Sequence, residues 1–507
     1  MPSQCSTLSA ANLTAANNGD NLVDYLSGDR SKYQSTATPL YRSRNHILGD
    51  IISGAPIFVG KPPFNYTDAG YASFASAKSG RESMIYAGAN DGMLHAFSAT
   101  TGVEMWASIP TTLMPKMFRL ADANYGTSHE SFVDAEPVIG DIYDAGAWKT
   151  ILVGGLGQGG KAYYALDVTD PANPKSLWEF TDANLGLSFG NPIITKRLDG
   201  TWIVAFTSGY NNADGKGHLY VLNAGTGAKL LDISTTAGSA ATPSGLAKIN
   251  AWVDVSTNNT ALRFYGGDLL GNLWRFDTDS RVMPYQSAFL LGQLQTVSGL
   301  PQPVTTKPET MLISKTHPVV VVGTGRYLGD PDISNTEQQS IYIVKDPLTA
   351  VGQGVLRTNP KMVKHTVTVA TGGTSATSTT EAIDWDTNSG WWFDLPNSGE
   401  RIINNMSLLS GTLFVPSAVP SGSVCISGGS SWLYRIDITS GLSVDPIGTL
   451  YSDSALIVGL TGAKLANGSA MMYVRDSKRG LKKFKTGDAS PTGLGDPRRT
   501  SWRELIN

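Results

Sequence analysis

Short runs in which apolar and polar residues alternate recur along this chain, and Gly- or Asp-rich tight turns separate them. The clearest copy covers residues 84–106 (MIYAGANDGMLHAFSATTGVEMW), where a strand, a turn and a second strand lead to an aromatic residue. Further copies, counted generously, lie at 161–180, 217–231, 263–280, 340–346, 431–445 and 471–484. Alternation with a period of two indicates strands, and repetition over tens of residues indicates a repeat architecture. Because each unit is a pair of strands, the pattern predicts a β-propeller.

The copies begin about 40 to 90 residues apart, whereas a regular propeller repeats more evenly. We therefore expect an all-β fold, a propeller of seven irregular blades with long loop insertions and few helices. Insertions of this kind project from the faces of a propeller, where binding residues concentrate. Residues 283–310 read as a Pro-punctuated linker with an edge strand. Residues 367–383 are rich in Ser, Thr and Gly and predict a surface loop.

The first part of the chain is polar and lacks the strand pattern. We interpret residues 1–40 as a lead-in segment from a missing N-terminal region, and residues 41–507 as the propeller domain. An amphipathic stretch at 22–28 allows a short helix in the lead-in. The start has no charged segment followed by an apolar core, and no apolar run approaches the ~20 residues of a membrane helix. We expect an exported fragment whose signal sequence is absent, without a transmembrane segment.

Composition excludes several classes of protein. The chain has 507 residues, of which 41% are hydrophobic and 16% charged, so it is globular and not disordered. The net charge of −3 provides no basic field that would attract nucleic acid. The two cysteines, Cys5 and Cys425, are too few for a disulfide framework and form no metal-ligand pair. Whether they pair with each other, stay free or pair with a missing segment is left open.

The repeat at residues 87–106 resembles the repeat of quinoprotein alcohol dehydrogenases, which favours an enzyme as one alternative. A quinoprotein site also needs carboxylates around a metal, a grip on the quinone and often vicinal cysteines, and the sequence has no Cys-Cys pair. The glycines at 154–160 lead into another strand instead of a helix, so they predict a turn and no phosphate cradle. Acidic stretches at 211–218 and 330–334 are interpreted as turns. We predict a non-enzymatic scaffold.

One loop has the spacing of a calcium site. Asp254, Ser256 and Asn258 stand at alternate positions, as in the first half of an EF-hand-like loop where alternate side chains direct oxygen at one cation. The next oxygen ligand would be expected at position 262, but Leu262 cannot bind a metal. The alternatives are a Ca²⁺ site completed by water and a solvated hairpin loop. Asp268 lies beyond the loop and is expected to cap a turn.

Several longer strings resemble the C-terminal propeller of the PilY/PilC family, the type IV pilus tip-associated adhesins and biogenesis factors. They occur in the same order as in that family and cover about residues 20–505. These strings are LVDYLSGDRS (22–31), YRSRNHILGDIISGAPIFVG (41–60), FVDAEPVIGDIYDAGAWKTILVGGLGQGGKAYYALDVTDP (132–171), FGNPIITKRLDGTWIVAFTSGYN (189–211), YGGDLLGNLWRFD (265–277), VGTGRYLG (322–329), GWWFDLPNSGERI (390–402), CISGGSSWLYRID (425–437) and RRTSWREL (498–505).

The resemblance implies an exported protein at the pilus tip, cell surface or outer membrane. It implies roles in pilus assembly, in opposing retraction, and in surface adhesion and twitching motility. Its partners would be pilins or minor pilins and a host or abiotic surface, with no nucleic acid. The family also has a calcium loop of the form D-x-[DN]-x-[DN]-x-x-x-D, in which Leu262 stands where a carboxylate is expected. The alternatives are a quinoprotein-like periplasmic oxidoreductase and an outer-membrane assembly scaffold.

Overall fold

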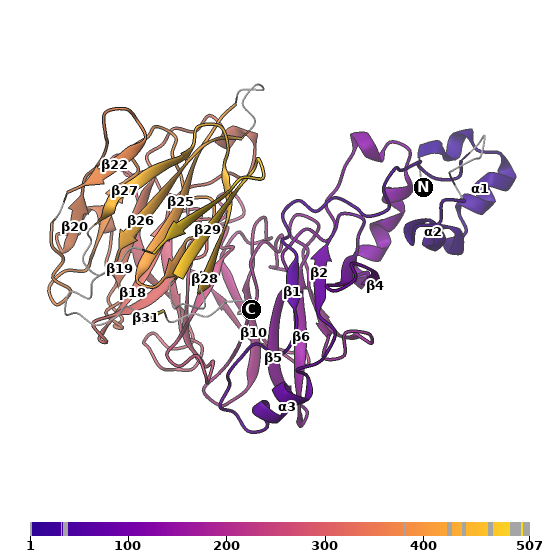
Figure 1. The fold of residues 1–507 in the computed structure, drawn as a ribbon, viewed down its shortest axis with the longest axis horizontal. Helices are drawn as coiled ribbons and strands as arrows, with labels where there is room; N and C mark the ends of the chain where they lie inside the picture. The colour runs from indigo at the N-terminus through magenta and orange to yellow at the C-terminus, as the bar shows by residue number, and fades with distance from the viewer. Residues whose placement is uncertain are drawn as a thin grey trace. The chain divides into compact units, whose positions relative to one another are not determined.

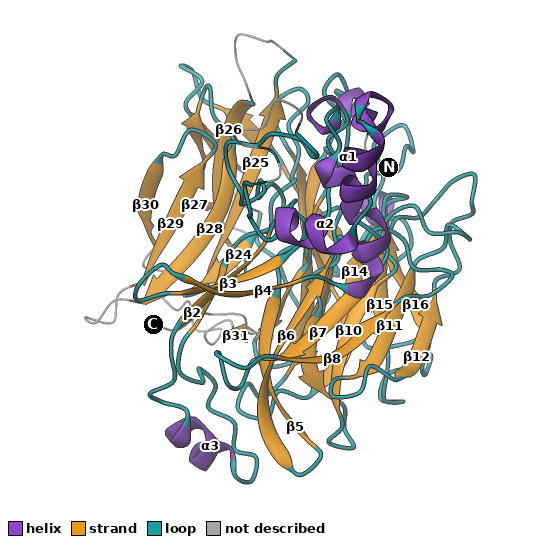
Figure 2. Cartoon of the chain, turned by 90° about the vertical axis from the view of Figure 1, so that its right-hand side faces the viewer, coloured by secondary structure: helices purple, strands orange, loops and turns teal. Residues whose placement is uncertain are grey.

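Strands dominate the computed structural model of the chain, and helices are few (Figures 1 and 2). The structure describes residues 3–31, 33, 39–379, 381–422, 428–438, 443–464, 470–486 and 498–499. Cys425 and residues 500–505 of the C-terminal string lie outside the described residues. The described residues form seven sheets, as a seven-bladed β-propeller requires. The predicted fold class is therefore confirmed.

The lead-in contains helices, shown in indigo in Figure 1. They are η1 (Ser3–Thr7), α1 (Ala10–Ala16) and α2 (Gly19–Leu26), so the amphipathic stretch at 22–28 does lie largely in a helix. The side chain of Asn18 accepts hydrogen bonds from the backbone of Asp20 and so caps the start of α2. On the other end of this helix, the buried Tyr25 and Leu26 belong to the same apolar cluster as residues of the first sheet.

The first four sheets each contain four strands that follow one another in sequence, and the pairing in the first, second and fourth is antiparallel. The first contains β1 (Ile57–Val59), β2 (Met84–Gly88), β3 (Leu94–Ser98) and β4 (Glu104–Ser108). The second contains β5 (Val138–Asp144), β6 (Ala147–Gly155), β7 (Tyr163–Asp167) and β8 (Lys175–Phe180). The third contains β9 (Ile193–Lys196), β10 (Trp202–Thr207), β11 (His218–Asn223) and β12 (Lys229–Ser234). The fourth contains β13 (Ile249–Val253), β14 (Ala261–Gly267), β15 (Asn272–Phe276) and β16 (Ala288–Gln293).

The last three sheets are less regular. The fifth contains β17 (Glu309–Ile313), β18 (His317–Gly323), β19 (Ser340–Lys345), β20 (Met362–His365), β23 (Gly390–Asp394) and β31 (Arg498–Arg499), and β20 pairs parallel to β23. The sixth contains β21 (Val367–Val369), β22 (Ser375–Ser378), β24 (Ser407–Leu409), β25 (Thr412–Pro420), β26 (Gly429–Asp437) and β27 (Ser443–Ser452). The seventh contains β28 (Ile457–Lys464), β29 (Ala470–Asp476) and β30 (Leu481–Lys485). The connections carry α3 (Tyr71–Ala77), η2 (Thr111–Ala121), η3 (Tyr125–Thr127), η4 (Asp330–Asp332) and η5 (Leu356–Thr358).

The seven copies seen in the sequence fall into seven different sheets. The copy at 84–106 forms β2, β3 and most of β4, for example, and the copy at 340–346 contributes only β19. Strands β7 and β19 are buried almost along their whole length, which explains their nearly continuous apolar sequences. The edge strand β4 is mostly exposed, so its sequence carries a weaker signal.

One expectation about a loop is wrong. Residues 367–383 were expected to form a surface loop, but β21 and β22 pair as an antiparallel hairpin there, and β22 also pairs with β27. The β-branched residues Val367, Thr368 and Val369 suit a strand whatever the Ser/Thr/Gly content around them. The linker at 283–310, in contrast, does contain the predicted edge strand, which is β16.

The chain divides into two compact units. One consists of Met1–Phe64, Ala69–Ile194 and Leu222–Ala228, and the other of Asn65–Asp68, Thr195–Val221 and Lys229–Asn507. The second unit contains the candidate calcium loop and a cleft described below. The predicted boundary between a lead-in at 1–40 and a propeller at 41–507 stays a prediction.

Candidate functional site

The candidate calcium loop joins β13 to β14 in the fourth sheet. Asp254 and Asn258 are exposed, and Ser256 is half-buried. A bulge interrupts the pairing of β13 with β14 between Trp252 and Val253. Asn259 follows with φ +52°, a left-handed conformation that Asn tolerates better than most residues. The structure therefore places the three predicted ligands on one short hairpin loop.

Two of the three predicted ligands already accept hydrogen bonds within the chain. The indole Nε1 of Trp252 donates to Oδ1 of Asp254 over 2.6 Å. The hydroxyl of Thr260 donates to Oδ1 of Asn258, also over 2.6 Å. Each bond engages one oxygen of a predicted ligand.

Leu262 is not directed to a polar site. It lies on β14, is half-buried, and packs against an apolar cluster that includes Trp252 and Tyr265. A calcium ion takes six to eight oxygen ligands, and this loop offers one carboxylate, one amide and one hydroxyl from the predicted set. Within the described residues no group of three or more His, Cys, Asp or Glu side chains is placed to hold a metal ion. The residues present do not make up the calcium site of the family pattern.

Hydrogen bonds to other segments of the chain, in place of a metal ion, hold this loop. The backbone N–H of Thr67 donates to the carbonyl of Thr257 over 2.9 Å, and the N–H of Lys196 donates to the carbonyl of Asn259 over 2.9 Å. The side-chain amide of Asn259 donates to the hydroxyl of Tyr66 over 3.1 Å. The short segment 65–68 and strand β9 thus anchor the middle of the loop, at Thr257 and Asn259.

Behind the loop lies a buried charged network. The guanidinium of Arg263 stacks 4.1 Å from the ring centroid of Trp252 and donates to the hydroxyl of Tyr265 over 2.6 Å. That hydroxyl donates to Asp346, which also accepts from Nη1 of Arg275, both over 2.6 Å. Burial and the negative charge of Asp346 raise the pKa of Tyr265 well above its ordinary value, so the hydroxyl stays protonated. The network joins strands of the fourth sheet to the end of β19 in the fifth.

Two buried histidines each lie between two carboxylates. His95 contacts Asp91 and Glu104, and His218 contacts Asp214 and Asp232, at 2.7 to 3.1 Å. Burial acts to lower the pKa of both rings, but the hydrogen bonds and charges of their carboxylate partners outweigh it and raise the pKa of each. Each ring also stacks on the aromatic residue two positions later. These contacts fasten the turn at 90–95 and the connection at 211–218 between β10 and β11.

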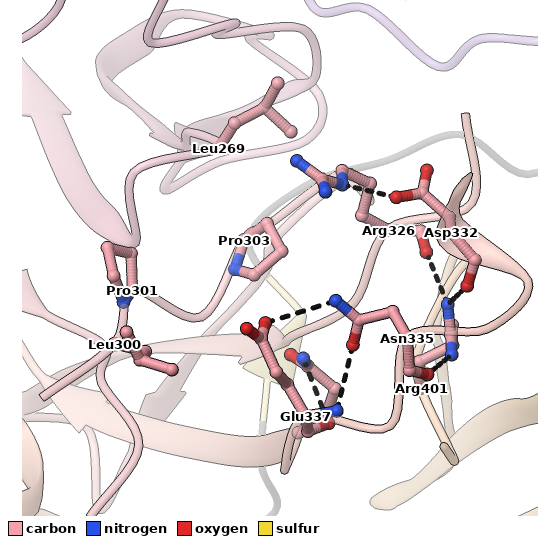
Figure 3. A pocket seen from close by; sticks show the side chains of 10 residues that line it. Leu269, Leu300, Pro301, Pro303, Arg326, Asp332, Asn335, Glu337 and Arg401 are labelled. Atoms are coloured by element: carbon pink, nitrogen blue, oxygen red, sulfur yellow. Dashed lines mark hydrogen bonds and ion pairs between the residues drawn. The ribbon is translucent and has the colours of Figure 1, made fainter. Parts of the chain in front are cut away.

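The second unit contains a cleft of about 200 Å³ that no sequence pattern indicated. Its apolar wall consists of Leu269, Leu300, Pro301 and Pro303, and its polar wall of Arg326, Asp332, Asn335, Glu337, Gln339 and Arg401 (Figure 3). The stretch 330–334 was interpreted as a plain acidic turn. It does form η4, but Asp332 accepts from Nε of Arg326 over 2.7 Å and from the backbone N–H of Leu328 over 2.8 Å. In the sequence, the only sign of this cleft is that Arg326 stands six residues before Asp332.

Arg401 makes the polar wall rigid. Its guanidinium is almost fully buried and donates to the backbone carbonyls of Arg326, Asp332, Asn335 and Gly399. Because its N–H groups donate to four backbone carbonyls, the guanidinium cannot turn toward a ligand. Arg401 therefore holds the loop at 326–335 in place.

Comparison with known proteins decides the family. A family profile described as the PilY1 beta-propeller domain matches residues 48–368, more than half of the chain. The chain belongs to the PilY1 β-propeller family. It is 34% identical to a type IV pilus biogenesis factor PilY1 homolog of Xylella fastidiosa, over 96% of this chain and 41% of that protein. It is 32% identical to the type IV pilus biogenesis factor PilY1 of Pseudomonas aeruginosa strain PAK, over 85% of this chain and 41% of that protein.

A solved PilY1 structure has the same fold. The crystal structure of the Pseudomonas aeruginosa PilY1 C-terminal domain superposes with a TM-score of 0.68 at 26% identity, and the match covers 84% of this chain and 99% of that one. The chain thus spans about two fifths of the length of the full PilY1 relatives and corresponds to their C-terminal propeller. Among the described residues, no helix is long and apolar enough to cross a membrane.

Proposed function

We propose that this chain is the non-enzymatic propeller of a type IV pilus biogenesis factor that supports pilus assembly, opposes retraction, and contributes to twitching motility and surface adhesion. The observation that carries the proposal is the family match over residues 48–368, together with relatives named as pilus biogenesis factors. The partners would be pilins or minor pilins and a host or abiotic surface. The place of action would be the pilus tip, cell surface or outer membrane of the exported full-length protein.

The test is genetic complementation in the source bacterium. The gene that encodes this propeller is deleted, and surface pili are counted by electron microscopy while twitching is measured on agar. We expect few pili and little twitching in the deletion strain and recovery with the full gene. Deleting the retraction motor as well should restore pili if the protein opposes retraction. Normal piliation and twitching in the deletion strain would refute the proposal.

The quinoprotein alternative has a direct biochemical test. The purified chain is incubated with pyrroloquinoline quinone and Ca²⁺, and dye-linked oxidation of alcohols and sugars is followed. We expect no turnover and no quinone absorbance band, because the sequence lacks the vicinal cysteines and the carboxylate set of such a site. Turnover above the rate without protein would contradict the non-enzymatic assignment.

For calcium, we propose at most weak binding at the loop from Asp254 to Leu262. Asp254 and Asn258 would be the protein ligands that hold the ion, with Ser256 or a backbone carbonyl assisting and water completing the shell. The missing carboxylate at position 262 removes one negative charge, and charge count tunes affinity at such sites. The ordering of the loop by residues 66, 67 and 196 would then make its conformation largely independent of Ca²⁺.

A further inference from the structure

In the described part of the chain, the seventh sheet has fewer strands than the others. It consists of β28, β29 and β30, whereas each of the other six sheets contains at least four strands. β30 stands at the outer end of its sheet, and among the described residues no strand pairs with its outer edge (Figure 2). A strand edge without a partner presents N–H and C=O groups that can pair with another extended chain.

Every second residue of β30 directs its backbone groups to this outer edge. The β29–β30 hairpin is bonded at both ends, where the N–H of Asp476 donates to the carbonyl of Gly480 and that of Thr486 to the carbonyl of Ala470. Hydrogen-bonded pairs alternate along an antiparallel ladder, so alternate residues of β30 bond to β29. The residues between them, whose N–H and C=O groups point away from the sheet, are Leu481, Lys483 and Lys485.

The segment around this edge is strongly basic, although the whole chain has a net charge of −3. Residues 475–485 contain one acidic residue, Asp476, whose carboxylate accepts from the backbone N–H groups of Lys478 and Gly480 inside the hairpin turn. The basic residues of the segment are Arg475, Lys478, Arg479, Lys482, Lys483 and Lys485. Within the described residues none of these six forms an ion pair. The edge therefore attracts an acidic partner.

Two of the lysines of β30 leave the edge open. In many proteins a lysine on an edge strand prevents pairing with another chain. Here the ammonium group of Lys482 lies 4.3 Å from the ring centroid of Tyr451 and donates to the carbonyl of the same residue. The ammonium group of Lys483 lies 5.5 Å from the ring centroid of Tyr473, which faces it on β29. Both side chains thus lie back over aromatic rings of the sixth and seventh sheets, and they do not cover the backbone of the edge.

We infer that the outer edge of β30 accepts an extended acidic segment of a partner protein as a fourth strand. Acidic side chains of the segment would face Lys482, Lys483 and Lys485, because opposite charges on directly facing residues stabilise a strand pair. An apolar side chain would face Phe484, which packs against the apolar cluster between the sixth and seventh sheets. Backbone pairing supplies the affinity in this mode of recognition, and facing side chains supply the specificity. This inference deepens the proposed function, on which it rests for the choice of a protein partner.

The experiment uses the complete 507-residue chain and amidated peptides that carry fluorescein on an N-terminal Gly-Gly linker. The peptides TEVEET, TQVQQT and TKVKKT differ only in the charge that faces β30, and binding is followed by fluorescence anisotropy at one ionic strength. Each pair of opposite charges changes affinity by a factor of roughly 1.4 to 5, so the acidic peptide should bind roughly 3- to 100-fold more tightly than the glutamine peptide. The lysine peptide should bind more weakly than both.

N-methylated peptides show whether the contact is a strand pair. Two further copies of the acidic peptide carry methyl groups on alternate backbone nitrogens, one copy on each edge of the strand. Methylation of the edge that pairs with β30 should remove binding, while methylation of the opposite edge should be tolerated. Binding that depended on charge alone would be the same for both copies.

Variants of the protein separate charge from backbone pairing. Lys483→Glu/Lys485→Glu should reverse the preference, so that the lysine peptide binds more tightly than the acidic one. The matched control Lys315→Glu/Lys361→Glu changes two exposed lysines outside β30 and should leave the preference intact. Lys483→Pro removes one outward N–H, which an edge strand tolerates, and should bind the glutamine peptide roughly 2- to 10-fold more weakly than Lys483→Gln.

Hydrogen–deuterium exchange of the wild-type chain, resolved to single residues, tests the same contact without a substitution. In the free chain the amides of residues 481, 483 and 485 should exchange fast, and those of 482 and 484, which bond to β29, should exchange slowly. The acidic peptide should slow the first three. Slow exchange of all five in the free chain would show that the chain covers its own edge, and would overturn the inference.

Equal affinity for the acidic and glutamine peptides would also overturn the inference, as would equal binding of the two methylated peptides. Binding of heparin with no binding of any peptide would assign the basic edge to an acidic polysaccharide and overturn it too. Failure of the peptide test with normal complementation of pili would reject the strand-accepting edge alone. Failure of complementation by the wild-type gene would reject the proposed function whatever the peptides do.

Discussion

The buried pair of Arg275 and Asp346 offers a sharp test of how the fourth and fifth sheets are held together. Both side chains are at most 1% exposed, and they meet over 2.6 Å. Replacing Asp346 with Ala removes the acceptor of Arg275 and of the Tyr265 hydroxyl in one step. The change leaves a positive charge buried without its counter-ion, which is much more costly than losing an exposed ion pair.

The size of the expected loss of stability depends on which hydrogen bonds Arg275 keeps in the variant. Breaking a buried ion pair from one side costs about 3–5 kcal/mol. Nη2 of Arg275 still donates to the carbonyls of Met283 and Thr349 over 2.6 and 2.8 Å, which favours the lower end. We expect the free energy of local unfolding to fall by about 3 kcal/mol. Protection of the backbone amides from hydrogen exchange should then decrease roughly 100-fold. The paired variant Arg275→Met/Asp346→Leu should lose less, about 1–2 kcal/mol, because no unpaired charge remains.

Hydrogen–deuterium exchange of β15 and β19 measures these losses locally, which suits a chain too large for two-state unfolding. Glu130→Ala is the matched control. It breaks the pair with Arg119, whose side chains are 34% and 51% exposed, and should cost less than about 1 kcal/mol. Equal losses in Asp346→Ala and Glu130→Ala, or a larger loss in the paired variant than in Asp346→Ala, would refute the reasoning.

Three further predictions concern the loop, a histidine and a glycine. Asp254→Ala should abolish any Ca²⁺ binding measured by calorimetry, because Asp254 is the one carboxylate of the predicted ligand set; equal affinity of wild type and Asp254→Ala would exclude this loop as the site. The raised pKa of His218 means that its stabilisation is complete below about pH 6.5 and is lost as pH rises through the folded-state pKa, so the denaturation midpoint should fall with rising pH more steeply in wild type than in His218→Gln. Identical slopes would contradict the role of its carboxylate partners. Gly159→Ala would bring a Cβ within 1.7 Å of the carbonyl of Phe132 and should lower the melting temperature, whereas Gly126→Ala, with open space around it, should not.

The sequence predicted the middle strands of the sheets better than their edges. Each hairpin copy has a regular alternation and a Gly or Asp turn because two neighbouring strands are packed on both faces and need a tight connection. The parallel strand β20 pairs with a strand that follows it by more than 20 positions. Such a pairing leaves no local pattern, so it could not be predicted.

The candidate sites differ in the same way between what local sequence spacing indicates and what contacts between distant segments determine. Asp254, Ser256 and Asn258 could be found because their spacing is local. That Asp254 accepts from Trp252, and that Leu262 packs on the apolar cluster, depends on the bulge in β13 and on strands that are distant in sequence. The cleft combines residues 269, 300–303, 326–339 and 401, and no periodicity connects these segments.

The anchoring of the candidate calcium loop by residues 65–68 has a consequence for the order of folding. Thr67 and Thr257 are 190 positions apart, and closing a loop of that length costs on the order of 5 kcal/mol of chain entropy, against roughly 1 kcal/mol for a hairpin turn. The hairpins should therefore form first, and the anchors of the loop should form late. The ring of Tyr66 lies 5.4 Å from that of Trp202, so tryptophan fluorescence reports this closure during refolding. The segment that carries Asp254 would thus reach its final conformation only after most of the surrounding strands have paired.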